Sequence, residues 1–212
     1  RGIKYAAMTG FSMKFSLKRS IRRHSSELAR ASSSRMTEEV FKLLQSGCSV
    51  KIVEQLVDMK LLVYVLPVIS ELIQSGKNIS LSRRFYESLR ELDGRIASEE
   101  DQVSREHMLF YLVRPFLLIP EEYESTTELF RELFSDMKRL IHPITPPNIE
   151  VEKAVALVFD QEAIKVPKHA VRKPKSQVTR YHGKRDDRSG RRRRGGKKKP
   201  KPQQKQSPEP KT

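Results

Sequence analysis

The chain has 212 residues, with 42 Lys and Arg against 26 Asp and Glu, so its formal net charge is +16 at pH 7. The excess lies at the C-terminal end: residues 165–212 hold 19 basic and 3 acidic side chains, whereas residues 1–164 hold 23 of each. No run approaches the roughly 18 consecutive apolar residues of a membrane-spanning helix, so we expect no membrane partner. A single cysteine, Cys48, excludes an internal disulfide and a Cys-rich zinc site and favours a reducing cytoplasm.

Residues 1–164 carry the pattern of consecutive helices. Apolar residues recur about every 3.6 positions, and four single glycines stand where helices could end, namely Gly10, Gly47, Gly76 and Gly94. We expect Ser49 to cap one helix, Pro67 to kink or divide another, and either Ser125 or Pro120 to begin a third. The other expected helices cover residues 79–93, 99–118, 121–141 and 149–160. The sequence therefore predicts an all-α fold, an irregular helical bundle.

Residues 165–212 have a different composition. They contain no Leu, Ile or Phe, only five apolar residues and six prolines. Such a segment cannot bury enough apolar surface to offset its chain entropy, so we predict a disordered basic tail. This gives three expected parts: residues 1–31, a helical body over 32–164, and the tail over 165–212.

The segment 13–31 predicts an amphipathic helix with one broad cationic face. At 100° per residue, one narrow stripe is apolar apart from His24, and the opposite side is basic. The basic side consists of Lys14, Lys18, Arg19, Arg22, Arg23 and Arg30. RNA is a matching partner, because closely spaced phosphates release counterions when Lys and Arg approach. A solvated surface helix and, less favoured, a membrane-surface helix remain alternatives.

The tail is a second candidate for RNA binding. Its densest basic runs are Arg191, Arg192, Arg193 and Arg194, followed by Lys197, Lys198 and Lys199. Binding through such runs is electrostatic and largely independent of base sequence. A solubility tail or a localisation signal is the alternative interpretation.

The sequence contains no recognisable catalytic or metal-binding motif. Phosphate-binding glycine loops, the zinc-protease helix motif and the serine-hydrolase elbow are all missing. No Asp-x-Asp pair occurs, although two-metal phosphoryl transfer needs such clustered carboxylates. We therefore predict no catalytic residue, no metal site and no cofactor within this chain.

The first eleven residues carry a family resemblance. Arg1-Gly-Ile-Lys-Tyr-Ala-Ala-Met-Thr-Gly-Phe11 resembles the end of the neck helix in bacterial poly(A) polymerases and in the CCA-adding tRNA nucleotidyltransferases. The resemblance aligns Arg1 and Lys4 with the last two basic positions of the family motif, near the active-site cleft. It also implies a longer polypeptide, with an upstream catalytic head that uses ATP and Mg²⁺.

A second block, Arg35-Met-Thr-Glu-Glu39 followed by an amphipathic Lys-Leu-Leu helix that ends at Gly47, is similar to the next signature of the same families. Arg35 and Glu39 stand four residues apart on one helix face. The resemblance implies that this pair helps to hold neck to body, and that the bundle is of the neck-and-body type.

Three functions follow as competing hypotheses. The first is the RNA-binding C-terminal portion of a poly(A)-polymerase-like nucleotidyltransferase, which positions the 3′ ends of mRNA or tRNA for a head domain and is inactive alone. The second is a stand-alone, non-enzymatic RNA-binding or RNA-chaperone protein. The third, a DNA-compacting protein, is weaker because such chains rarely need a neutral core of this size.

Overall fold

The computed structural model describes residues 2–76, 78–98, 103–168 and 170–171. Over these residues the secondary structure is helical, without strands, which confirms the all-α prediction. The tail from residue 172 onward, with its runs at 191–194 and 197–199, lies outside the described residues, as does Arg1.

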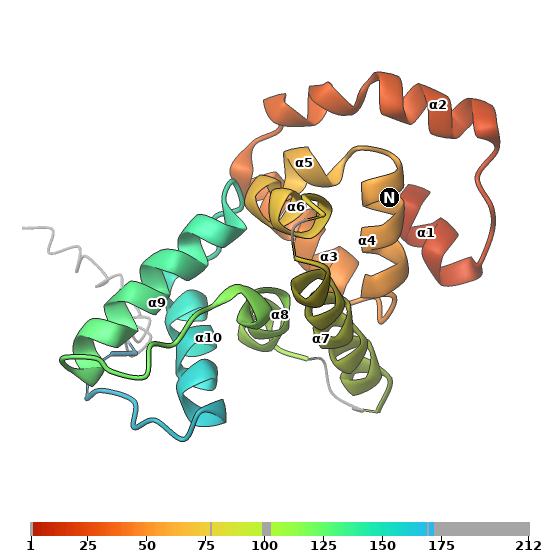
Figure 1. Cartoon of the computed structure of the whole chain (residues 1–212). Helices are drawn as coiled ribbons and strands as arrows, with labels where there is room; N and C mark the ends of the chain where they lie inside the picture. Colours follow the sequence, from red (N-terminus) through yellow and green to blue (C-terminus); the bar gives the residue numbers. More distant parts are fainter. Residues whose placement is uncertain (1, 77, 99–102, 169, 172–212) are drawn as a thin grey trace, which may run out of the picture. The chain divides into compact units, whose positions relative to one another are not determined.

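The N-terminal half consists of short helices joined by tight turns (Figure 1). They are α1 (Gly2–Thr9), α2 (Phe15–Arg23), the 3-10 helix η1 (Ser25–Arg30), α3 (Ser33–Leu44), α4 (Ser49–Asp58), α5 (Leu62–Val65) and α6 (Pro67–Gln74). The remaining helices are α7 (Ile79–Ser98), α8 (Arg105–Val113), the 3-10 helix η2 (Arg114–Phe116), α9 (Thr126–Ile141) and α10 (Asn148–Gln161).

Helix α8 lies at the centre of the core. It packs against α3, α7, α9 and α10, and five of its nine residues are buried, namely Met108, Leu109, Phe110, Leu112 and Val113. A helix that is apolar on most of its circumference lies inside a domain rather than on its surface. The central position of α8 therefore explains why its sequence lacks a clear polar face.

Several helix ends follow the local signals in the sequence. Pro67 is the first residue of α6, where its missing N–H is not needed, so it separates α5 from α6. Ser125 begins α9, because its hydroxyl accepts a hydrogen bond from the backbone N–H of Glu128 at 3.2 Å. Gly10, Gly47 and Gly76 each have a positive φ after a helix. At Gly47 a side chain would be both strained and 3.3 Å from Ile96.

Other expected boundaries are wrong. The segment 13–31 is not one helix: α2 ends at Arg23, and η1 follows because the buried Ser25 hydroxyl donates to the carbonyl of Arg22 at 3.0 Å. Gly94 does not end α7, which continues to Ser98. The helix expected over 99–118 begins at Arg105, and Pro120 begins no helix.

Helix α4 is capped from a distance rather than by Ser49. Ser49 is its first helical residue, and its backbone N–H donates to a carboxylate oxygen of Asp93 at 2.7 Å. The next N–H, of Val50, donates to the other oxygen at 3.2 Å. A carboxylate at the positive end of a helix satisfies two N–H groups that have no partner within the helix. Asp93 belongs to α7, so this cap also fixes α4 against α7.

The packed unit continues beyond residue 164. Val166, Ala170 and Val171 are partly buried against the core. Pro167 and Ala170 line a shallow pocket with Phe130 of α9. Residues 165–168 and 170–171 are therefore part of the packed structure, because their few apolar side chains find partners on α9 and the core.

Candidate nucleic-acid interface

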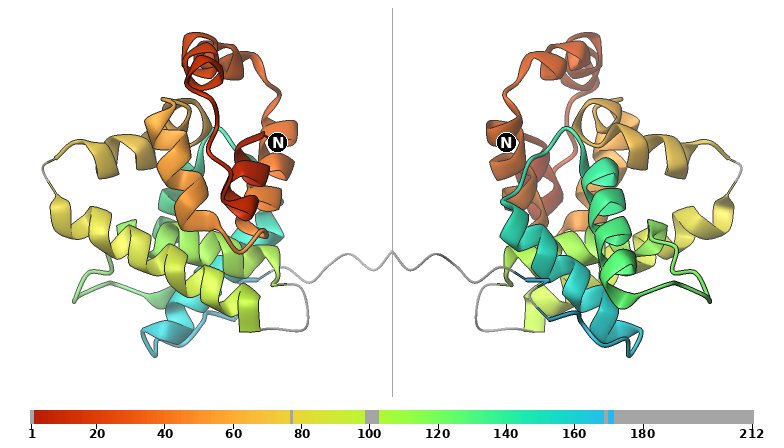
Figure 2. Two further views of the ribbon diagram at one scale, coloured as in Figure 1. Left: turned by 90° about the vertical axis from the view of Figure 1, so that its right-hand side faces the viewer. Right: turned by 90° about the vertical axis from the view of Figure 1, so that its left-hand side faces the viewer.

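Helix α2 is anchored at the C-terminal end of α4. The Arg22 guanidinium donates through Nε to the backbone carbonyl of Asp58 at 2.8 Å and through Nη2 to the carboxylate of the same residue. The Lys18 ammonium lies 3.7 Å from the other carboxylate oxygen. Since carbonyls at a helix C-terminus have no partner within the helix, Arg22 satisfies one of them from outside. Two side chains of the expected cationic face thus dock α2 against the end of α4. Figure 2 shows the ribbon of this N-terminal region from two further sides.

The remaining cations of α2 are free to bind an external partner. Arg19 and Arg23 are exposed, and neither has an ion pair or a side-chain hydrogen bond among the described residues. At 100° per residue, Arg19 lies 100° from Lys18 and 60° from Arg22, and Arg23 lies 140° and 100° from them, so Arg23 is turned further from the two docked side chains. Lys14, which precedes the helix, is also exposed and unpaired in the described structure. Arg19 and Arg23 form the outer cationic face of α2, and the unpaired Lys14 stands at its N-cap.

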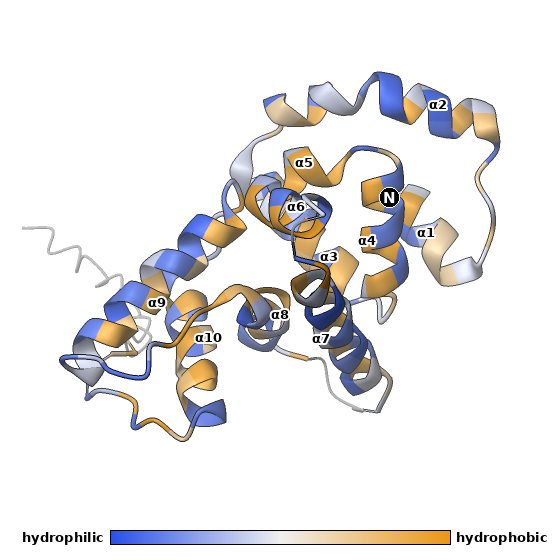
Figure 3. Cartoon of the chain, viewed as in Figure 1, coloured by the Kyte–Doolittle hydropathy of each residue, from blue (hydrophilic) through white to orange (hydrophobic). Residues whose placement is uncertain are grey.

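Exposed apolar side chains gather in the same part of the chain. The first seventeen residues contribute five of the large hydrophobic side chains that the described structure leaves exposed, namely Tyr5, Met8, Phe11, Phe15 and Leu17. Figure 3 shows hydrophobic and hydrophilic residues interleaved along α1 and α2. Tyr5, Met8 and Phe11 precede the predicted amphipathic segment 13–31, and apolar periodicity alone does not show whether a side chain is exposed.

An apolar groove of about 480 Å³ lies between α1, η1, α3 and the α4–α5 region. Ile21 and Leu28 line one side, and Met36 and Val40 of α3 line the other. The side chains are mainly aliphatic, so the groove offers few polar groups to a nucleic acid.

The structure places the other expected site residues near this groove. Arg35 and Glu39 both line it, although the described ion pair of Glu39 is with Lys42, at 3.1 Å. Lys4 is half-buried on α1, which packs against α4. Arg30 pairs with Glu27 of η1 at 3.1 Å and so is less available than Arg19 or Arg23.

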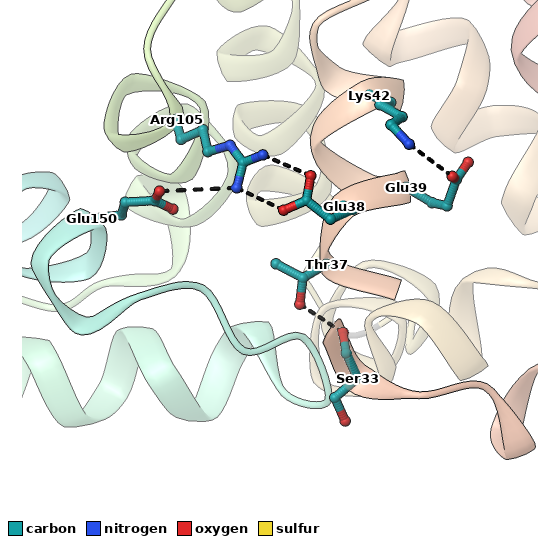
Figure 4. Close-up of polar contacts among 7 residues, drawn as sticks. All are labelled: Ser33, Thr37, Glu38, Glu39, Lys42, Arg105 and Glu150. Atoms are coloured by element: carbon teal, nitrogen blue, oxygen red, sulfur yellow. Dashed lines mark hydrogen bonds and ion pairs between the residues drawn. The ribbon is translucent and has the colours of Figure 1, made fainter. Parts of the chain in front are cut away.

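Arg105 of α8 joins α3 to the central bundle (Figure 4). Its guanidinium donates to both carboxylate oxygens of Glu38 on α3, at 2.9 and 2.7 Å, and lies 3.9 Å from Glu150 on α10. It also stacks over the ring of Phe41, with 4.8 Å to the centroid. A planar guanidinium is suited to such simultaneous bidentate and stacking contacts. Sequence analysis missed this cluster because its partners lie far apart in the chain.

The electrostatic environment differs between the two carboxylates. The hydrogen bonds from Arg105 hold the pKa of Glu38 below its usual value. Burial raises the pKa of Glu150, more than Arg105 lowers it. One oxygen of Glu150, Oε2, is buried without a hydrogen-bond partner. The cluster is a structural support that joins α3 to α8 and α10.

The described residues offer no group of three or more His, Cys, Asp or Glu side chains that could hold a metal ion. None of the helices in the described ranges is long and apolar enough to cross a membrane.

Comparison with known proteins gives a match within the N-terminal half of the chain. Residues 10–73 match the family described as the probable RNA and SrmB-binding site of polymerase A. No curated protein and no solved structure matches the chain. The matched region begins at Gly10 and includes α2 with its outer cationic face, η1 and α3 to α5, and nearly all of α6. Residues 10–73 are thus related to poly(A) polymerases, through a region assigned to RNA binding.

Proposed function

We propose that this chain holds RNA for a poly(A)-polymerase-like, template-independent nucleotidyltransferase, with the outer cationic face of α2 and the basic tail contacting phosphates. The observation that carries the proposal is the division of labour on α2. Lys18 and Arg22 are engaged by Asp58, whereas Arg19 and Arg23 are exposed and unpaired within the region that matches an RNA-binding family. Cations without a carboxylate partner are available to neutralise RNA phosphates, and the release of the counterions then contributes to the free energy of binding.

The catalytic step belongs to a head domain in this proposal. Its metal-binding carboxylates would use Mg²⁺ and ATP to extend the 3′ end of mRNA or tRNA, in the cytoplasm. The neck-like block at residues 1–11 supports this assignment, and it would place Arg1 and Lys4 nearest to that head. The RNA-binding residues of the chain itself would orient the RNA strand and keep it bound between additions.

The first experiment measures RNA binding by the purified chain. We expect Arg19→Gln with Arg23→Gln to weaken binding of a labelled single-stranded RNA about 10-fold at low salt. The slope of log K against log salt should become shallower by about 1.4, because each lost phosphate contact removes about 0.7. Fluorescence anisotropy at several salt concentrations gives both quantities.

A charge-matched control is Arg84→Gln with Arg131→Gln, on α7 and α9. Both side chains are exposed and have no ion pair within the described ranges. The control should bind RNA nearly as the unmodified chain does. Equal losses in the two double variants would show that only net charge matters and would overturn the assignment to α2.

A second experiment separates the enzyme-associated role from a stand-alone RNA-binding protein. The chain should bind RNA but add no nucleotide to a primer with ATP and Mg²⁺. When it is joined to a nucleotidyltransferase head, the Arg19 and Arg23 variants should raise the KM for RNA and leave the rate at saturating RNA nearly unchanged. Primer extension by the chain alone would contradict the assignment of catalysis to a separate head domain.

A further inference from the structure

The first turn of α2 carries an exposed aromatic ring, Phe15, in the same i, i+4 row as the two free arginines of the helix. Phe15, Arg19 and Arg23 are spaced by four residues, so they form one stripe that advances about 6 Å per step along the helix. Phe15 is 75% exposed and Arg19 and Arg23 are exposed as well. A large exposed aromatic side chain on a strongly cationic helix has no role in the packing of this unit.

From this juxtaposition we infer that Phe15 is a stacking site for an unpaired base, and that the stripe Phe15–Arg19–Arg23 selects single-stranded over double-stranded RNA. This inference rests on the proposed function and adds to it the class of RNA and a residue that recognises it. Bases in single strands stack on aromatic side chains, whereas bases in a duplex are already stacked on each other.

The rigidity of α2 supports the inference. On the inner side, Lys18 and Arg22 are bound to Asp58, and Ile21 is partly buried against the core. The helix therefore presents its outer stripe in one orientation, and little entropy is lost when a strand binds. The ring provides the contact to a base, while the two guanidinium groups along the same line provide contacts to the phosphates.

Two more exposed aromatic side chains precede the stripe. Phe11 is 77% exposed in the turn before α2, and Tyr5 is 63% exposed on α1. Lys14 lies between Phe11 and the stripe and is also exposed. Alternating aromatic and cationic side chains are typical of surfaces that bind single strands without strong base preference. We therefore assign the segment from Phe11 to Arg23 to one strand of RNA rather than to an apolar protein partner, which would leave its cations unpaired.

The test uses the absence of tryptophan from the chain. In Phe15→Trp, the introduced indole is the sole tryptophan reporter, and its fluorescence should be quenched when a 12-residue oligoadenylate binds. Quenching should saturate together with the anisotropy of the labelled RNA. A blunt RNA duplex of equal length and inorganic polyphosphate should cause little quenching, because neither offers an unpaired base.

The matched control is Leu118→Trp, at a side chain that is 83% exposed in the loop after η2. Its fluorescence should change little with oligoadenylate. If both tryptophans are quenched equally, or if polyphosphate quenches Phe15→Trp as strongly as RNA does, the stacking assignment is wrong.

Affinity provides an independent readout. Phe15→Leu should weaken oligoadenylate binding about 5- to 150-fold, since stacking on one base contributes about 1–3 kcal/mol, and should leave polyphosphate binding unchanged. Phe15→Tyr should restore most of the affinity. Because Phe15 is exposed, the helical circular dichroism of these variants should match that of the unmodified chain.

The outcomes separate this inference from the proposed function. Normal binding by Phe15→Leu together with weak binding by the Arg19 and Arg23 variant would refute stacking and leave phosphate binding by α2 in place. Normal RNA binding by Phe15→Leu and also by the Arg19 and Arg23 variant would refute both the stacking inference and the proposed phosphate binding by α2. A blue shift of the Phe15→Trp emission with rising protein concentration, without RNA, would show a protein interface at this surface and would also refute stacking.

Discussion

Arg105 illustrates how a single residue organises this fold. Its side chain makes a bidentate contact to Glu38, an approach to Glu150 and a stacking contact to Phe41, so three helices meet at one guanidinium. Thr37, one position before Glu38, adds a second link, because its hydroxyl accepts from the backbone N–H of Thr145 at 2.8 Å. Helix α3 is thereby fixed beneath α2 and η1, and the groove between them keeps its walls.

The two carboxylates around Arg105 predict opposite effects of neutralisation. Arg105 lowers the pKa of Glu38 in the folded state, so the ionised form stabilises the fold above the unfolded pKa of about 4.5. That contribution is lost as the pH falls toward the lowered pKa. Glu38→Gln should therefore lower the melting temperature by a few degrees at pH 7, and the difference should shrink below pH 4.5.

Ionisation of Glu150 has the opposite effect on the stability of the fold. Burial raises its pKa in the folded state, so the protonated form is favoured there, and ionisation destabilises the fold as the pH rises from 4.5 through the raised pKa. Glu150→Gln should match or exceed the unmodified chain in melting temperature at pH 7. Neither Glu38→Gln nor Glu150→Gln changes the nearby charges of Glu106 and Lys153, which are paired at 3.3 Å, so these charges do not account for a difference between the two variants. Equal responses of the two variants between pH 4 and pH 7 would contradict this assignment.

At the scale of elements, α2 performs two tasks with two faces. Its helical and cationic character could be predicted from spacing alone, and so could its expected partner, but its length could not. The division between inner and outer cations could not, because it depends on Asp58, a residue 36 positions after Arg22. The end of α2 at Arg23 depends likewise on hydrogen bonds of Ser25, which a helical pattern does not encode.

Predictions from sequence succeeded where the signal is local and steric. Proline at the start of α6, the Ser125 cap of α9 and the positive φ of Gly47 each follow from one residue and its neighbours. They failed where tertiary contacts override a weak preference. Gly94 lies within α7, since burial of Leu92 and partial burial of Ile96 stabilise a continuous helix beyond the roughly 1 kcal/mol that glycine costs.

The docking of α2 on Asp58 predicts that loss of this contact raises the affinity for RNA rather than lowering it. Asp58→Asn should release Lys18 and Arg22 and remove a negative charge from beside the proposed RNA surface. A unit charge about 10 Å away in water contributes about 0.4 kcal/mol, so RNA affinity at low salt should rise about 2-fold or more. Amide hydrogens of α2 should exchange faster, because two contacts that hold the helix are weakened.

The control for Asp58→Asn is Glu132→Gln, which removes the same charge from an exposed position on α9. Glu132→Gln should raise RNA affinity less than Asp58→Asn does, and it should leave the amide hydrogen exchange of α2 unchanged. If Asp58→Asn weakens RNA binding, then a fixed orientation of α2 matters more than the released cations, and the electrostatic account of this face is wrong.

At the scale of the whole molecule, most of the basic charge and the folded unit are separate. Residues 172–212 hold 17 basic and 3 acidic side chains, so residues 1–171 are close to neutral. A neutral folded unit needs no counterions to remain compact, and its few unpaired cations are positioned by the fold. The tail, in contrast, contributes charge without a position given by the described structure. The two parts should therefore differ in how their RNA binding responds to salt.

Removing residues 172–212 tests this separation. If the full chain makes about six phosphate contacts, the plot of log K against log salt has a slope near −4. The three unpaired cations Lys14, Arg19 and Arg23 alone would give a slope of about −2. The truncated chain should keep its melting temperature, since Val166, Ala170 and Val171 remain packed. Truncation after Ile164 should have the same slope and a lower melting temperature. Anisotropy titrations and circular dichroism measure both. An unchanged slope would exclude the tail from RNA binding, and complete loss of binding would exclude α2 as an interface of its own.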